Sequence, residues 1–153
     1  MQVENSETKQ VKSYISTILN TYIPERTKFY RISNNCFARD LDGEFKTSEA
    51  IENCYRQAWA EASIMLPNLY SFVGGEPYAK TFNSIPVPAP MATFARTENS
   101  SLYYRSLCEE SRARLLNGEK IYGFSFDECS SNAFKLFEQA QDELIKMKKK
   151  YGL

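Results

Sequence analysis

Histidine is absent from the 153 residues of this chain. Its absence removes the commonest metal ligand and the usual general base, and with them the Ser–His and Cys–His pairs of nucleophilic enzymes. Neither a Gly-x-Gly-x-x-Gly pattern nor a phosphate-binding loop ending in Gly-Lys-Ser/Thr occurs. The sequence therefore predicts no cofactor, and any catalysis would have to use carboxylates, Lys, Tyr or Arg.

An excess of charge of either sign is also lacking. Lys plus Arg and Asp plus Glu each total 19, so the formal net charge is zero. Nucleic-acid binders usually carry a clustered excess of basic residues, which makes a nucleic-acid partner an unfavoured expectation here. No apolar run is long enough to span a bilayer, and the polar segment 1–10 does not resemble a signal peptide.

Cysteine is scarce, and no Cys-x-x-Cys pair occurs. The four cysteines are Cys36, Cys54, Cys108 and Cys129. Three of them fall on or beside the apolar faces of expected helices, where a free cysteine behaves as a small hydrophobic residue. We therefore expect buried free thiols and a cytoplasmic or other reducing intracellular location.

What the sequence does contain is helical periodicity, in four segments. Apolar residues recur every three or four positions over 11–22, 47–66, 99–116 and 125–150. Pro24 is expected to end the first segment, and Ser125 with Glu128 forms a capping box at the start of the last. These features predict a single domain over 1–153 with a mainly α fold, an irregular four-helix arrangement.

A long crossover is expected between the second and third helices, over 68–97. It contains three alternating prolines at 86–90 and many aromatic residues, so we expect it to be ordered and to pack on something. A minor β-hairpin, with a strand at 28–32 and a turn at Asp42-Gly43, leaves an α+β fold as the alternative. The aromatic residues that we take as candidates for a protein interface are Tyr70, Phe72, Tyr78, Phe82 and Phe94.

The segment 38–49 resembles a degenerate EF-hand loop. Asp40 and Asp42 occupy the third and fifth loop positions, Gly43 the sharp turn, and Glu49 the last position, where a bidentate carboxylate belongs. Ala38 stands at the first ligand position. The resemblance offers four metal candidates, Asp40, Asp42, Glu44 and Glu49.

A simpler interpretation explains the same residues. Asp42-Gly43 is a turn signal, Thr47 or Ser48 can cap the following helix, and Glu49 suits the positive end of that helix dipole. Arg105 and Glu109, four residues apart on the third helix, likewise fit a solvated surface with weak ion pairs.

Three functional hypotheses follow. The leading one is a small accessory or structural protein that binds another protein, as a subunit or adaptor of a larger assembly, because aromatic residues are enriched at interfaces. A small inhibitor or regulator of a larger machine, for example a viral one, is the first alternative. A carboxylate-based or divalent-metal-dependent enzyme, or a ligand-binding protein, is the second.

Overall fold

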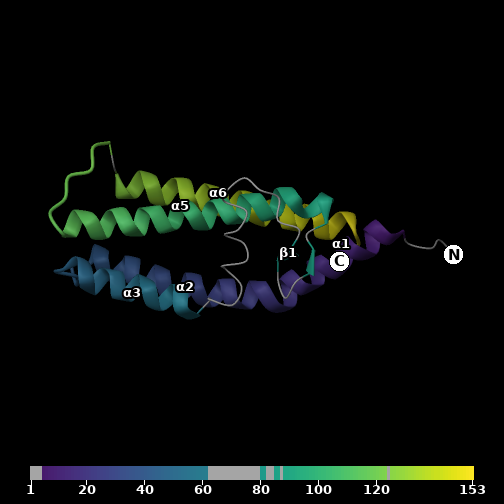
Figure 1. The fold of residues 1–153 in the computed structure, drawn as a ribbon, viewed down its shortest axis with the longest axis horizontal. Helices are drawn as coiled ribbons and strands as arrows, with labels where there is room; N and C mark the ends of the chain where they lie inside the picture. The colour runs from purple at the N-terminus through teal and green to yellow at the C-terminus, as the bar shows by residue number, and fades with distance from the viewer. Residues whose placement is uncertain (1–4, 62–79, 82–84, 87, 124) are drawn as a thin grey trace.

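A computed structural model describes residues 5–61, 80–81, 85–86, 88–123 and 125–153. Long helices dominate this part of the chain, so the fold is mainly α (Figure 1). The elements are α1 (Ser6–Thr17), a π-helical turn η1 (Ile18–Tyr22), α2 (Ile23–Leu41), α3 (Ser48–Glu61), β1 (Lys80–Thr81), β2 (Ile85–Pro86), a 3-10 turn η2 (Ala89–Met91), α5 (Ala92–Leu116) and α6 (Phe126–Lys150).

The helices form two hairpins that lie side by side. Figure 1 shows α2 paired with α3 and α5 paired with α6, with the hairpins stacked along the length of the molecule. α1 continues the line of α2 and packs against the N-terminal part of α5 and the C-terminal part of α6. This arrangement confirms the expected four long helical segments.

Pro24 does not end the first helix, contrary to the prediction. The helix runs through a π-helical turn instead, in which the Ile23 N–H donates to the Ile18 carbonyl, five residues back. Proline lacks an N–H and its ring clashes with the carbonyl four residues back, so a local change of hydrogen-bond register is a usual way to accommodate it. Pro24 then falls in the first turn of α2, where proline is tolerated.

The expected strand at 28–32 is helical, since it lies within α2. The described strands are two residues each, and they pair antiparallel as Lys80 with Pro86 and Thr81 with Ile85. Such a short pairing does not make an α+β fold.

The crossover expected over 68–97 is helical at its C-terminal end. Pro90 lies in the first turn of η2, and α5 follows directly from Ala92. The proline run therefore leads into a helix, and α5 begins seven residues before the start of the expected segment 99–116.

Two hydrophobic clusters hold the helices together. The larger one joins α1, η1 and α2 to the first turns of α5 and the last turns of α6, through residues such as Tyr14, Phe29 and Leu144. The smaller one joins α2, α3 and the end of α5, around Cys36, Ile51 and Ala113.

The cysteines are paired, so the expected free thiols are wrong. Cys36 in α2 is bonded to Cys54 in α3, and Cys108 in α5 is bonded to Cys129 in α6. Each bridge closes one hairpin across its turn, at sequence separations of 18 and 21. Cysteines on the apolar faces of two neighbouring helices lie opposite each other once the hairpin forms, which scarcity and spacing alone did not reveal.

Candidate functional site: a pocket between the two hairpins

A hollow among the described residues lies where α2 and α3 face α5 and α6. It has a volume of about 200 Å³, and a smaller hollow of about 80 Å³ adjoins it. The two share Asn34, Arg105, Ala133 and Phe134. They therefore form one continuous groove, which we call the hairpin pocket.

Aromatic rings form the walls of the hairpin pocket. Phe37 of α2 lies 5.2 Å from Phe126 of α6, measured between ring centroids. Phe134 stacks on Phe137 at 5.9 Å, and the side chain of Phe134 remains 57 % exposed. The exposed ring of Phe134 therefore extends the apolar surface of the hollow into solvent.

Arg105 forms the polar side of the pocket. Its Nη2 donates to Ser33 Oγ at 2.7 Å and to Asn34 Oδ1 at 2.6 Å, which ties α5 to α2. Its Nε lies 3.5 Å from Glu109 Oε1, and its guanidinium lies 4.9 Å from the centroid of the Tyr30 ring. The solvated surface expected for Arg105 and Glu109 is therefore wrong, because Glu109 is buried and the pair faces the opposite hairpin.

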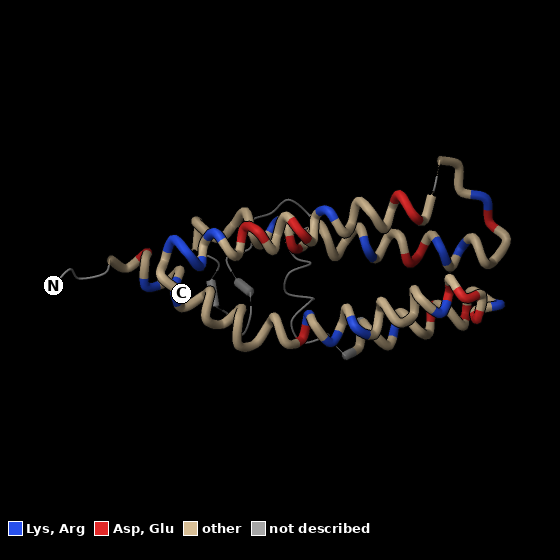
Figure 2. Tube along the Cα trace, turned by 180° about the vertical axis from the view of Figure 1, so that it is seen from behind, with Lys and Arg blue, Asp and Glu red and all other residues tan. Residues whose placement is uncertain are grey.

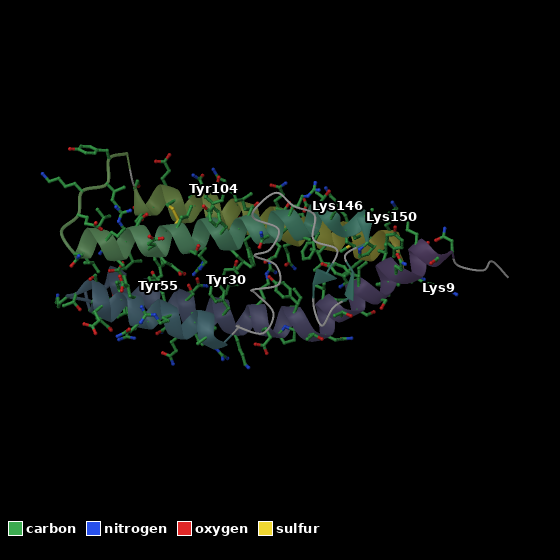
Figure 3. All side chains as sticks on the ribbon, in the orientation of Figure 1. Lys9, Tyr30, Tyr55, Tyr104, Lys146 and Lys150 are labelled. Atoms are coloured by element: carbon green, nitrogen blue, oxygen red, sulfur yellow. A yellow bond between two sulfur atoms is a disulfide. The ribbon has the colours of Figure 1, made fainter. Side chains whose placement is uncertain are left out.

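Tyr55 of α3 closes the inner end of the pocket. Its side chain is 5 % exposed, and its hydroxyl oxygen has no hydrogen-bond partner among the residues described. Burial, together with the negative charges of Glu109 and Asp40, raises the pKa of Tyr55 above its ordinary value of 10.0. The phenol is therefore neutral at physiological pH and keeps its O–H as a hydrogen-bond donor. Figure 3 shows Tyr30 and Tyr55 on the side of their hairpin that faces α5.

Ion pairs flank the pocket along the hairpin interface. Toward the helix α1 end, Arg26 Nε donates to Glu98 Oε1 at 2.8 Å and Arg26 Nη1 donates to Gln141 Oε1 at 2.7 Å. On the other side of the pocket, Arg112 forms a bidentate ion pair with Asp40, in which its Nε and Nη2 donate to the two carboxylate oxygens at 2.7 and 2.9 Å. These contacts fix the spacing of the two hairpins and so the width of the pocket.

The four carboxylates proposed as metal ligands are engaged elsewhere or separate. Asp40 lies in the last turn of α2, bonded to Arg112, and Glu44 pairs with Arg39 at 2.7 Å. Asp42 follows the end of α2, and Glu49 lies in the first turn of α3. Within the described ranges, no three His, Cys, Asp or Glu side chains gather as a metal site would require.

The turn and cap chemistry of the same segment is present. Gly43 has a φ of +74°, a conformation that favours glycine, and the Ala50 N–H donates to Thr47 Oγ1 at 3.2 Å. The turn at Asp42-Gly43 and the cap at Thr47 therefore explain these residues without a metal ion.

One of the five aromatic interface candidates is described, and it is a core residue. Phe94 is 1 % exposed and belongs to the larger hydrophobic cluster. Tyr70, Phe72, Tyr78 and Phe82 lie outside the described residues.

Sequence reasoning missed the aromatic walls of the hairpin pocket. Phe126, Ser130 and Phe134 repeat every four residues on α6, beside the stripe of Ala133, Phe137 and Ala140 that packs on α5. A second apolar row, offset from the main stripe of a helix, was the available signal. Its partner Phe37 lies outside the four segments in which we expected helices.

Comparison with known proteins identifies no relative: no family model, no curated protein and no solved structure matches this chain. None of the helices within the described ranges combines the length and the apolar character needed to cross a membrane. Acidic and basic positions are interspersed along both hairpins (Figure 2).

Proposed function

We propose that this protein is a small accessory protein that binds another protein through the hairpin pocket. The observation that carries the proposal is the 57 % exposure of Phe134 at the edge of a hollow walled by other phenylalanines. Energetically important contacts in protein interfaces are typically aromatic or arginine side chains at well-packed pockets. Phe134 supplies the exposed ring, and the space beside it can receive a side chain from the partner.

The rigidity of the site supports the same proposal. The disulfide Cys108–Cys129 ties the start of α6, which carries Phe126, to α5, and Cys108 itself lines the pocket. A site built on stapled helices loses little conformational entropy when a partner binds, so more of the contact energy remains as affinity.

Site-specific photocrosslinking tests the proposal. A benzophenone amino acid at position 134 is expected to capture one protein from the native source, in about a one-to-one adduct. The matched control carries the same group at Tyr104, which is 47 % exposed and lies on α5 (Figure 3). Adding Phe126→Ala should remove the adduct at position 134.

The result that contradicts the proposal is equally definite. If positions 134 and 104 capture the same mixture of proteins, or if Phe126→Ala leaves the adduct unchanged, the hairpin pocket is not the interface.

A further inference from the structure

The two sulfur atoms of the Cys36–Cys54 bridge lie in different surroundings. Cys36 of α2 is fully buried in the smaller hydrophobic cluster, whereas Cys54 of α3 is half-buried at the edge of that cluster. A disulfide opens when a thiolate reaches one of its two sulfur atoms, so access decides which sulfur is attacked. Cys54 is therefore the more accessible partner of this bridge.

A guanidinium lies beside the Cys54 sulfur. Arg39 Nη1 donates to Cys54 Sγ at 3.7 Å, and the side chain of Arg39 is 45 % exposed, so this contact lies at the solvent edge of the hairpin. Arg39 Nε donates to Glu44 Oε2 at 2.7 Å, and the guanidinium carbon lies 4.9 Å from the centroid of the Phe45 ring. Glu44 offsets part of the positive charge, but the guanidinium is the charged group that contacts the sulfur.

A positive charge at this position favours thiol–disulfide exchange at Cys54. The thiolate of a dithiol attacks Cys54 Sγ, the bond to Cys36 Sγ breaks, and Cys36 leaves with the electron pair and takes a proton. The second thiol of the reagent then displaces Cys54 as a thiolate, and the dithiol becomes a cyclic disulfide. Both steps bring negative charge to the sulfur of Cys54, and a neighbouring arginine stabilises a thiolate.

The Cys108–Cys129 bridge lies in different electrostatic surroundings. Cys108 is 2 % exposed, and Cys129 is half-buried in the first turns of α6. The helix N-terminus there attracts an anion, but Asp127 and Glu128 lie in the same turn and repel one. Among the described residues, no hydrogen bond joins an arginine or lysine to either sulfur of this bridge.

We propose that Cys54 is a thiol-exchange site, at which a low-molecular-weight thiol opens the Cys36–Cys54 bridge before the Cys108–Cys129 bridge, with Arg39 promoting the attack. Opening removes the covalent link between α2 and α3 and leaves the α5–α6 hairpin closed. Because α2 and α3 supply one side of the hairpin pocket, exchange at Cys54 would loosen that side alone. The site itself does not depend on the proposed function.

Stepwise reduction of the full chain tests the proposal. The oxidised protein is incubated with increasing dithiothreitol at neutral pH, alkylated in denaturant, and analysed by the mass of each cysteine peptide. We expect an intermediate with two alkyl groups, one on Cys36 and one on Cys54. With glutathione in place of dithiothreitol, acid quenching should trap a mixed disulfide on Cys54 rather than on Cys36.

Arg39→Gln tests the role of the guanidinium. The variant keeps a long polar side chain and removes the charge, so the Cys36–Cys54 bridge should open about 2- to 5-fold more slowly, the range expected for an exposed charge contact. Arg39→Lys should open at nearly the native rate. A variant that merely loosened the hairpin would expose the bridge and speed its opening, so the sign of the change separates the two explanations.

Arg114→Gln is the matched control. Arg114 pairs with Glu119 at 2.8 Å over the same five-residue spacing as Arg39 with Glu44, and its side chain is 50 % exposed. The variant removes an equivalent charge away from the Cys36–Cys54 bridge, and the opening rate of that bridge should stay at its native value.

Four results would overturn the proposal. They are the opening of the Cys108–Cys129 bridge first, as expected if thiols entered through the hairpin pocket that Cys108 lines, opening of both bridges together, a glutathione adduct on Cys36, and a native or faster rate in Arg39→Gln. The measurement needs no partner protein, so its failure leaves the photocrosslinking test of the proposed function standing.

Discussion

The Glu98 carboxylate is fully buried between the hairpins, where Arg26 and Gln141 form a short polar chain with it. Burial raises the pKa of Glu98 above its ordinary value of 4.5, and the neighbouring Arg26 offsets part of that rise. Burying an ion pair costs desolvation free energy that the pairing only partly returns, so we expect the Arg26–Glu98 pair to add little to the net stability of the fold.

The pKa of Glu98 predicts how stability depends on pH. Because the folded protein holds the Glu98 proton more tightly than the unfolded chain does, the stabilisation linked to this proton is complete below about pH 4.5. It is lost as the pH rises through the higher pKa of the folded state. The free energy of unfolding of the native protein relative to Glu98→Gln should therefore fall as the pH rises from 4 to 7.5, measured by urea unfolding.

Glu7 provides the control for that measurement, since it lies exposed in the first turn of α1. Glu7→Gln should show no such trend relative to the native protein. An increase with pH in the difference between the native protein and Glu98→Gln would mean that the ion pair with Arg26 outweighs burial.

At the scale of elements, each hairpin is a unit closed by its own disulfide. Cross-linking two helices across a turn restricts the unfolded chain, and a loop of about 15 residues corresponds to about 3 kcal/mol in the loop-entropy account. The bridges here close separations of 18 and 21 residues, so each should contribute a similar amount.

Removing one bridge at a time checks this expectation. The double variants Cys36→Ala/Cys54→Ala and Cys108→Ala/Cys129→Ala should each lose about 3 kcal/mol of unfolding free energy in urea. Under full reduction, the native protein should approach the stability of a variant that lacks both bridges. Equal stability of oxidised native protein and single-bridge variants would show that the bridges constrain nothing in the unfolded chain.

The sequence predicted the elements better than their ends. Amphipathic spacing predicted a helix in each of four segments where the structure has one, but it missed α2 over Ile23–Leu41. The Ser125 capping box marked the start of α6, where the Glu128 N–H donates to Ser125 Oγ. The prediction that Pro24 ends the helix was wrong because a π-helical turn accommodates the proline, a backbone change that rules for helix ends do not include. We expected Phe94 to be an interface residue on an extended segment, but it lies in the first turn of α5, where its ring is buried.

The hairpin pocket could not be predicted from the sequence, for a different reason. Its polar lining residues come from four helices, and nothing local in the sequence indicates that these helices converge; they are Asn34, Tyr55, Arg105, Glu109 and Ser130. The offset row of Phe126 and Phe134 was visible, but a row of aromatic residues becomes a wall only once the opposing hairpin is placed.

At the scale of the whole molecule, the pairing of all four cysteines bears on where the protein works. Disulfides persist in oxidising compartments and are rare in the cytosol, where thiols are kept reduced. The reducing location expected from the sequence rested on free thiols, and in the structure every described cysteine is bonded. The two bridges therefore favour an oxidising compartment, although the location itself stays a prediction.

The thiol state of the protein in its native source decides between the two locations. Alkylation of freshly lysed material without reductant should leave Cys36, Cys54, Cys108 and Cys129 unmodified, and alkylation after reduction should modify all four, as read by the mass of the intact protein. Cys36 and Cys108 are buried, so the lysate must be denatured during alkylation to expose any free thiol. Four alkylated cysteines without reductant would restore the cytoplasmic location and would mean that the hairpins hold together by packing alone. An unmodified chain would place the protein in a compartment where disulfides form.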